Sequence, residues 1–297
     1  MKHITVLQTE AIKGLELKEK DVVVDATYGA GGHAKLICAK LGSKGKYIGI
    51  DADATALING KENLERKGGP EIHLVHDNFA NLTAALSSLH INRVDRILAD
   101  LGWRTDQFTD SNKGFSFNAD EPLLMTYGSP EQYLFTAHDI VNSWDEENIA
   151  DIIYGYGEER NSRRIAKAIV TARERTPIMT SGQLAEIVLQ VAPPFARKGK
   201  IHPATKTFQA LRIAVNDELQ KLEQFISASL TTLASDGILA IITFHSLEDR
   251  IVKLRFKEAV VNGQYQLLTK KPITASAEEL KENPRARSAK LRLIKKL

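Results

Sequence analysis

The chain has 297 residues, 43% of them hydrophobic, and a net charge of only +3. This length and apolar content predict a globular protein with one large core, or one core that carries a smaller packed unit. The longest apolar run is far shorter than the roughly 20 residues of a membrane span, so a membrane protein is not expected. Cys38 is the single cysteine, which excludes an intrachain disulfide and a multi-cysteine metal site. No secretory signal pattern opens the chain, so we expect a cytoplasmic protein.

The first third of the chain alternates strand and helix patterns. A β-branched run at 21–26 leads into a glycine-rich loop at 27–33, and a helical stretch follows at 34–41. Further strands are predicted at 46–50, 73–76 and 96–99, with a helix at 82–89 between the last two. Each of these three strands is followed by an acidic residue, namely Asp51, Asp77 and Asp100. The alternation predicts an α/β fold with a parallel, doubly wound sheet.

The strand pattern disappears after about residue 105. Residues 105–204 contain a loop and then several helical segments, so we predict an inserted helical subdomain between sheet segments at 1–104 and 205–297. One of these helices, at 161–175, carries apolar residues on one face and basic residues on the other. A long helix is expected from about 205 to 233, a central strand at 237–244, and two last strands at 265–269 and 291–295.

The loop after the first strand carries glycines at 29, 31 and 32. A glycine loop between a strand and a helix lets the backbone approach a ligand and directs free N–H groups at it. The spacing is G-x-G-G-H, which differs from the G-x-G-x-x-G of most dinucleotide-binding proteins. A purely structural turn is the alternative.

Asp51 ends the second predicted strand, about 20 residues after the glycine loop. An acidic residue in this place can accept hydrogen bonds from both hydroxyls of an adenosine ribose. NAD and S-adenosylmethionine both fit the loop and the acid, so these two features leave hydride transfer and methyl transfer open.

Two further residues lie where the third and fourth strands end. Phe79 is placed to wall an adenine ring, or else to cover the core. Asp100 faces the crevice in which open α/β sheets bind ligands, and Gly102 behind it leaves room. Its carboxylate could hold the amino group of a methionyl moiety or accept a hydrogen bond from a substrate amine. Capping of the next turn is the alternative.

Eight sequence blocks resemble those of the MraW family of bacterial small-subunit ribosomal RNA cytosine-N4 methyltransferases. They are DATYGAGGH at 25–33, DLG at 100–102, GFSF at 114–117, YGEER at 156–160, HPATKTFQALRI at 202–213, VN at 215–216, FHSLEDRIVK at 244–253 and NPRARSAKLR at 283–292. The resemblance implies a class I, Rossmann-like methyltransferase sheet with a helical insertion that helps to recognise RNA. It implies S-adenosylmethionine as cofactor and a cytidine of the ribosomal decoding region as substrate. By position, the resemblance gives the cofactor residues as Gly31, Gly32, His33, Asp51, Phe79, Asp100 and Gln107.

Two blocks depart from the family pattern. After residues 100–102 the family usually continues with a small apolar residue, two serines and a proline, whereas this chain has Trp103, Arg104, Thr105 and Asp106 before Gln107. The usual D-G-P-L-D-M-R-M-D block reads DEPLLMTYG at 120–128. These changes affect residues that are expected to place the substrate and to close over the cofactor. They motivate a second hypothesis, in which the protein is a ribosome-assembly factor that keeps the fold and has lost catalysis. An NAD-dependent oxidoreductase is a third reading that fits only the first two strands.

Methyl transfer to a cytosine amine depends on positioning, because the amine lone pair is delocalised into the ring. We predict Asp100 as the acceptor near the amine and Trp103 as a stacking partner for an unstacked base. His33 and His245 are read as hydrogen-bonded structural residues more readily than as bases. The chemistry requires no metal.

Basic residues gather in three segments and predict an RNA-binding face. The predicted RNA-binding residues are Arg160, Arg164, Lys167, Arg197, Lys198, Lys200, Lys206, Arg285 and Arg287, with Arg212, Lys290 and Arg292 nearby in the same segments. The expected partner is small-subunit ribosomal RNA within an assembled or nearly assembled subunit, and a homodimer is left open.

Overall fold

The computed structural model describes residues 4–58, 60–102, 112–199 and 201–297. The chain divides into two compact units. The first joins Met1–Arg104 to Leu219–Leu297, and the second is Thr105–Glu218. No helix in the described ranges is both long and apolar enough to cross a membrane.

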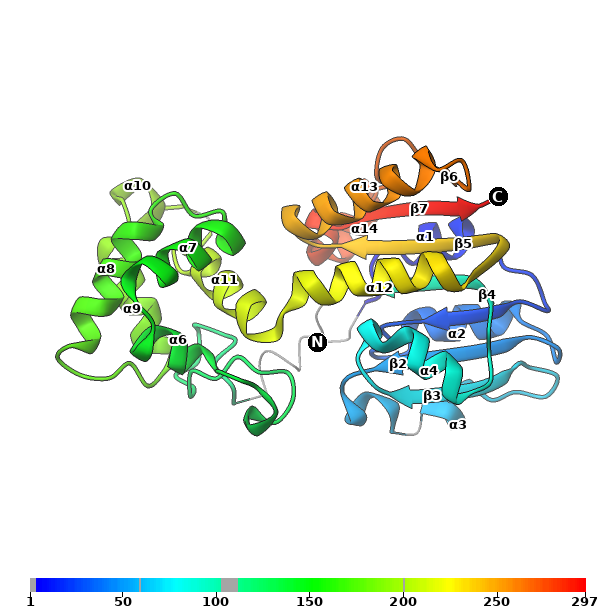
Figure 1. Cartoon of the computed structure of the whole chain (residues 1–297), viewed down its shortest axis with the longest axis horizontal. Coiled ribbons are helices and arrows are strands. Elements are labelled where there is room, and N and C mark those ends of the chain that lie inside the picture. The colour runs from blue at the N-terminus through cyan, green and yellow to red at the C-terminus, as the bar shows by residue number, and fades with distance from the viewer. Residues whose placement is uncertain (1–3, 59, 103–111, 200) are drawn as a thin grey trace. The chain divides into compact units, whose positions relative to one another are not determined.

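The first unit is built on a seven-stranded sheet with the order β3-β2-β1-β4-β5-β7-β6 (Figure 1). Its strands are β1 (Val22–Asp25), β2 (Lys46–Asp51), β3 (Glu71–His76), β4 (Val94–Asp100), β5 (Leu233–Thr243), β6 (Tyr265–Leu267) and β7 (Lys290–Lys296). The first five strands run parallel, while β7 lies antiparallel to both β5 and β6. This confirms the predicted doubly wound α/β sheet. The strand order reverses between β1 and β4, the place where such sheets form a ligand crevice at their carboxyl ends.

Helices cover both faces of this sheet. One core is formed with α1 (Gln8–Gly14), α2 (Gly32–Lys40), α3 (Gly60–Leu64) and α14 (Ala277–Glu282). The opposite core is formed with α4 (Leu82–Ser88), α12 (Glu218–Thr232) and α13 (Ser246–Val261). Strand β5 is buried continuously from Gly237 to Thr243, as expected for a central strand covered on both sides. Short 3₁₀ helices occupy Ala54–Leu57, Phe79–Asn81 and Pro284–Ser288.

The second unit is helical and has a core of its own. Its described helices are α6 (Ala137–Ser143), α7 (Glu146–Gly157), α8 (Ser162–Arg173), α9 (Ser181–Val191), α10 (Pro194–Arg197) and α11 (Thr205–Asn216), with a 3₁₀ turn at Pro130–Gln132. Capping boxes begin two of them, Thr136 with Asp139 at α6 and Thr180 with Gln183 at α9. On α8, Ile165, Ala166 and Ile169 are buried, which agrees with the amphipathic pattern in the sequence.

The predicted helix from 205 to 233 is two helices. The chain leaves α11 at Asp217, which adopts a left-handed conformation (φ 51°), and α12 starts at Glu218. Helix α11 buries Phe208, Leu211 and Val215 in the core of the second unit. This unit therefore ends at Glu218, whereas the sequence analysis placed the end of the insertion at residue 204.

The end of α11 is fixed by buried polar contacts. Asn216 is 1% exposed, and its amide nitrogen donates to the carbonyl oxygens of Met125 and Arg212, at 2.7 and 2.9 Å. Its amide oxygen accepts from Tyr127 N at 3.0 Å. Arg212 makes two parallel hydrogen bonds to the Glu218 carboxylate, at 2.8 and 2.9 Å. These contacts join the loop around Met125 to the carboxyl end of α11.

Replacing Asn216 with alanine is expected to destabilise the second unit by about 2 kcal/mol, because it leaves buried backbone groups without hydrogen-bond partners. Urea unfolding of the full chain measures the change. Asn118→Ala, at an exposed position of the same unit, is the control and should stay within about 0.5 kcal/mol of the wild type. Equal stability of the two variants would contradict the role given to Asn216.

Candidate cofactor site and active site

The glycine turn connects the carboxyl end of β1 to the first residue of α2. Gly29 and Gly31 have positive φ angles of 56° and 74°, a conformation that favours glycine. Tyr28 N donates to Ile50 O at 2.9 Å, which joins the turn to β2. The helix N-terminus at Gly32 and His33 carries amide groups that have no partner within the helix. The turn thus presents backbone donors at the carboxyl edge of the sheet, as a cofactor-binding loop requires.

Gly32 has no room for a side chain. A Cβ atom there would overlap the hydroxyl oxygen of Thr5, and Gln8 Nε2 donates to Gly32 O at 3.1 Å. The segment before α1 therefore packs directly on the turn.

Asp51 ties the end of β2 to the same turn. Its carboxylate accepts hydrogen bonds from Gly29 N at 2.7 Å and from Asp53 N at 2.8 Å. The acid and the glycine turn, both of which are predicted to contact the cofactor, therefore lie side by side.

Asp100 lies at the carboxyl end of β4, beside the turn. Its amide donates to Thr27 Oγ1 at 2.7 Å, and its Oδ1 accepts from Gly102 N at 2.9 Å. The side chain is 16% exposed, so one edge of the carboxylate stays accessible. The bond to Gly102 N shows that Asp100 also caps the following turn, the alternative that the sequence left open.

His33 and Asp25 complete a buried group of ionisable side chains. His33 Nε2 lies 3.4 Å from Asp100 Oδ2, and neither ring nitrogen has a hydrogen bond of good geometry to a described residue. Asp25 is fully buried and accepts a hydrogen bond from the Tyr47 hydroxyl at 2.9 Å. Burial raises the pKa of Asp25 to about 6, although the nearby His33 and the Tyr47 hydroxyl act to lower it.

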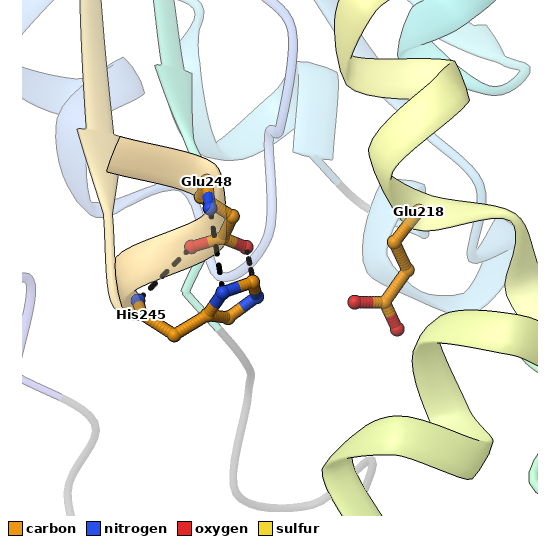
Figure 2. A group of neighbouring side chains, drawn as sticks. All are labelled: Glu218, His245 and Glu248. Atoms are coloured by element: carbon orange, nitrogen blue, oxygen red, sulfur yellow. Dashed lines mark hydrogen bonds and ion pairs between the residues drawn. The ribbon is translucent and has the colours of Figure 1, made fainter. Parts of the chain in front are cut away.

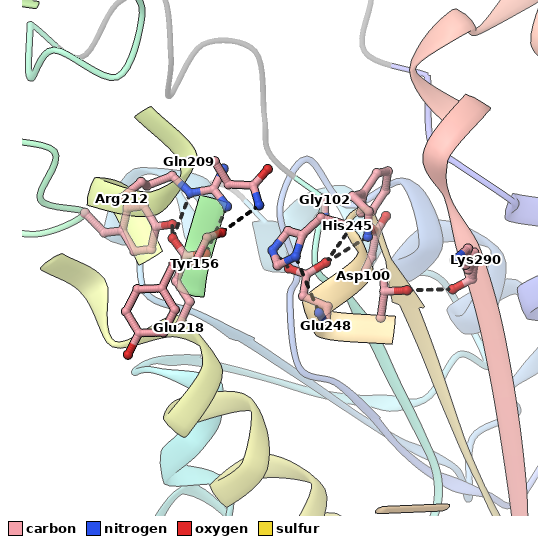
Figure 3. Close-up of polar contacts among 12 residues, drawn as sticks. Asp100, Gly102, Tyr156, Gln209, Arg212, Glu218, His245, Glu248 and Lys290 are labelled. Carbon is pink, nitrogen blue, oxygen red and sulfur yellow. Dashed lines mark hydrogen bonds and ion pairs between the residues drawn. The ribbon is translucent and has the colours of Figure 1, made fainter. Parts of the chain in front are cut away.

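Because Gly102 has no side chain, the Phe244 ring and the Asp100 carboxylate can both lie against it. A Cβ atom at this position would lie 2.7 Å from the Phe244 ring and 2.8 Å from Asp100 Oδ1. Figure 3 shows Gly102, Asp100 and His245 at this edge of the sheet. Any larger residue here would displace the carboxylate or the ring.

The end of β5 is held by a capping box that begins α13. His245 Nδ1 accepts from Glu248 N, while Glu248 Oε2 accepts from His245 N at 3.3 Å (Figure 2). The same oxygen also accepts from Phe244 N at 2.8 Å. His245 Nε2 lies 3.1 Å from Glu248 Oε1. Because Nδ1 accepts a hydrogen bond, the ring proton is assigned to Nε2, which supports the reading of His245 as a structural residue.

Phe79 packs against the core. Its ring meets Phe225 edge to face at a centroid distance of 5.3 Å, and the residue is half-buried. Covering the core, the alternative weighed for this residue, is therefore part of its role, while a contact with an adenine ring stays a prediction. Trp103, Gln107 and Lys200 lie outside the described residues.

The predicted RNA-binding residues fall into two groups. Arg160, Arg164, Lys167, Lys198, Arg285 and Arg287 have exposed side chains. Arg197 and Lys206 are exposed as well, but they make local contacts: Arg197 donates to Gln190 O and Ala192 O at the carboxyl end of α9, and Lys206 donates to Glu158 O. Of the further basic residues named from the sequence, Arg212 is paired with Glu218, and Lys290 and Arg292 bind Asp249 at 3.1 and 2.7 Å.

Thr5, Asp25 and Thr27 lie at the site but were not among the site residues predicted from the sequence. Thr27 is part of the glycine turn. Asp25 ends an otherwise apolar strand directly before that turn, so the sequence did carry a signal for a buried carboxylate beside a ligand-binding loop. Nothing in the sequence indicated that Thr5 packs against Gly32.

Asp25 predicts a specific pH dependence of stability. Its folded pKa of about 6 lies above the ordinary value of 3.8, so the folded protein holds the proton more tightly and loses stability as pH rises from about 4 to 6. Asp25→Asn removes this loss. The stability of this variant relative to the wild type should grow by about 3 kcal/mol between pH 4 and pH 7, as measured by urea unfolding. The exposed control Asp151→Asn should follow the wild type, and parallel curves for all three proteins would refute the assignment.

The comparison with known proteins agrees with this geometry. The model of the MraW methylase family matches residues 1–297. A protein named ribosomal RNA small subunit methyltransferase H from Clostridium botulinum is 46% identical, with 100% of this chain and 99% of the relative covered. A protein of the same name from Brevibacillus brevis is 42% identical over 99% of this chain and 98% of its own length. The solved structure of an rRNA methylase from Streptococcus thermophilus, covering 98% of this chain and 93% of its own, has a TM-score of 0.43 at 12% identity, too distant to add to the assignment.

The family match confirms the predicted activity, methyl transfer with S-adenosylmethionine as the donor. It sets aside the oxidoreductase reading. The chain belongs to the MraW methylase family.

Proposed function

We propose that the protein transfers the methyl group of S-adenosylmethionine to the N4 amine of a cytidine in the decoding region of small-subunit ribosomal RNA. One observation carries the proposal: the glycine turn, Asp51 and Asp100 meet where the strand order of the sheet reverses. The names of the relatives that cover the whole chain support the substrate.

The cofactor would lie along the carboxyl edge of β1, β2 and β4. The backbone amides around Gly31, Gly32 and His33 would contact it closely, and the Asp51 carboxylate would accept from its ribose hydroxyls. Asp100 would contact its methionyl amino group or the substrate amine, and Phe79 would wall its adenine ring. The family resemblance adds Gln107. S-adenosylmethionine supplies an electrophilic methyl group on a sulfonium.

The chain's own contribution to the reaction is positioning and proton acceptance. As the new N–C bond forms and the S–C bond breaks, the amine nitrogen gives up a proton. Asp100 Oδ2 is the acceptor at the crevice, and His33 Nε2 at 3.4 Å lies beside it to stabilise or share that proton. Trp103 would stack on the unstacked cytosine.

The second unit would recognise the RNA. The outer face of α8 carries Arg163, Arg164 and Lys167, with Arg160 just before it, and all four side chains are exposed. None of the four has an ion-pair partner among the residues that the structure describes. Such a face attracts phosphates independently of sequence, which suits a module that holds RNA while the first unit reacts with one base.

The proposed substrate also determines the expected partner and cellular location. We propose an assembled or nearly assembled small subunit as the substrate, and hence a cytoplasmic location. A homodimer stays a prediction.

An assembly factor without activity is the second candidate. This hypothesis rests on the two sequence blocks, at 103–106 and 120–128, that depart from the family pattern. In the second block, Glu121 accepts from Gly114 N at 2.9 Å and Tyr127 N donates to Asn216. The altered block thus has a structural role within the second unit, and its departures from the family pattern do not remove Asp51, Asp100 or the glycine turn.

Labelled S-adenosylmethionine and undermethylated small subunits test the proposal directly. We expect label in N4-methylcytidine after nucleoside analysis of the subunit RNA. Naked RNA and fully methylated subunits are the controls. Binding of the cofactor and the subunits without labelled N4-methylcytidine would favour the assembly factor.

Asp100→Ala is expected to lower turnover by about 10²–10⁴-fold, because it removes the acceptor at the crevice. Single-turnover assays at saturating cofactor measure the effect. Asp151→Ala, which changes the same charge on an exposed face of α7, should leave turnover unchanged. Near-normal turnover of Asp100→Ala would remove Asp100 from the mechanism.

A further inference from the structure

A hollow on the first unit gathers positive charge away from the cofactor site. It lies between α13, β6 and β7, and is lined by Lys253, Phe256, Lys257, Leu267, Thr269, Lys270, Arg292 and Leu293. Four of these side chains are cationic, and none is acidic. Phe256 and the two leucines form its floor, and we call it the lysine hollow.

The lysines of the hollow lack local counter-charges. Lys253, Lys257 and Lys270 are exposed, and none has an ion-pair partner among the described residues. The acids nearby are engaged elsewhere, since Asp249 binds Arg292 and Lys290, and Glu258 binds Arg255. Three amines that face one hollow repel one another. A bound anion would remove this repulsion.

The position of the hollow fits a substrate that extends past the active site. Lys253 and Lys257 are one turn apart on α13, so they lie on one face of this helix. Arg292 follows Lys290 by two residues on β7, and Lys290 pairs with Thr243, the last residue of β5. Arg292, the lining residue on β7 that is nearest to this end, therefore lies about 7 Å from the carboxyl edge of the sheet, the edge at which the proposed active site lies.

We propose that the lysine hollow binds a backbone phosphate of the substrate RNA, and that Lys253, Lys257 and Lys270 supply the contacts. This inference rests on the proposed function and adds an RNA contact on the sheet-bearing unit to that of the helical unit. The Thr269 hydroxyl offers a neutral donor to the same phosphate. RNA is favoured over a protein partner because the rim is cationic and apolar surface is confined to the floor.

The test compares the double variant Lys253→Glu/Lys257→Glu with a matched control, Lys40→Glu/Lys44→Glu. The control makes the same charge change at exposed lysines near the start of β2. Fluorescence anisotropy with a labelled 20-nucleotide RNA of the substrate sequence, over a series of salt concentrations, gives the affinity. The hollow variant should bind more weakly, with its slope of log affinity against log salt reduced by about 2, whereas the control slope stays at the wild-type value. Calorimetry with S-adenosylmethionine should give wild-type affinity for both variants.

Three results would overturn the inference. Equal losses of RNA affinity in the hollow variant and the control would mean that only the net charge of the protein affects RNA binding. Unchanged binding of naked RNA together with weaker binding of small subunits would assign the hollow to a ribosomal protein. An excess of inorganic phosphate should compete only weakly, and strong competition would point to a free anion instead. Methylation by the wild type is measured in parallel, so a failure of the proposed function is recognised separately.

Discussion

The Asp51 carboxylate accepts a hydrogen bond from Gly29 N at 2.7 Å, and the candidate site is arranged around this contact. It joins the end of β2 to a turn that only glycine accommodates easily at residues 29 and 31. With this turn fixed, α2 begins at Gly32 and places His33 against Asp100. The ends of three parallel strands are thereby held together at the point where the strand order reverses, and a cofactor can contact all of them.

Burial of charge gives this site its chemical character. Asp25 lies beneath the turn with a raised pKa, and its partners are the Tyr47 hydroxyl and the nearby His33. Asp100 remains partly exposed at the crevice, while His33 is buried behind it. The Asp25 carboxyl group is thus buried and costly to ionise, whereas the Asp100 carboxylate is partly exposed at the proposed cofactor site. This difference in environment agrees with the proposal that Asp25 has a structural role and that Asp100 takes part in the reaction.

Sequence patterns predicted the parts of the structure that depend on local order. Strand ends, the glycine turn, Asp51 and Asp100 follow from residues close together in the chain. Contacts between distant residues left no such signal: Thr5 against Gly32, and Asp249 with Lys290 and Arg292. The break at Asp217 was also missed, because neither glycine nor proline marks it. Buried contacts of Asn216 and Glu218 stabilise that break, and they override the helical pattern.

Calorimetric titration of S-adenosylmethionine into the wild type, Asp51→Ala and Asp53→Ala tests the central claim most directly. Asp53 is a neighbouring acid whose carboxylate accepts from Thr55 N instead of the glycine turn. The wild type and Asp53→Ala should bind with equal affinity. Loss of a hydrogen-bonded carboxylate should weaken Asp51→Ala by about 10–100-fold. Wild-type affinity in Asp51→Ala would show that the turn and this carboxylate do not form the cofactor site.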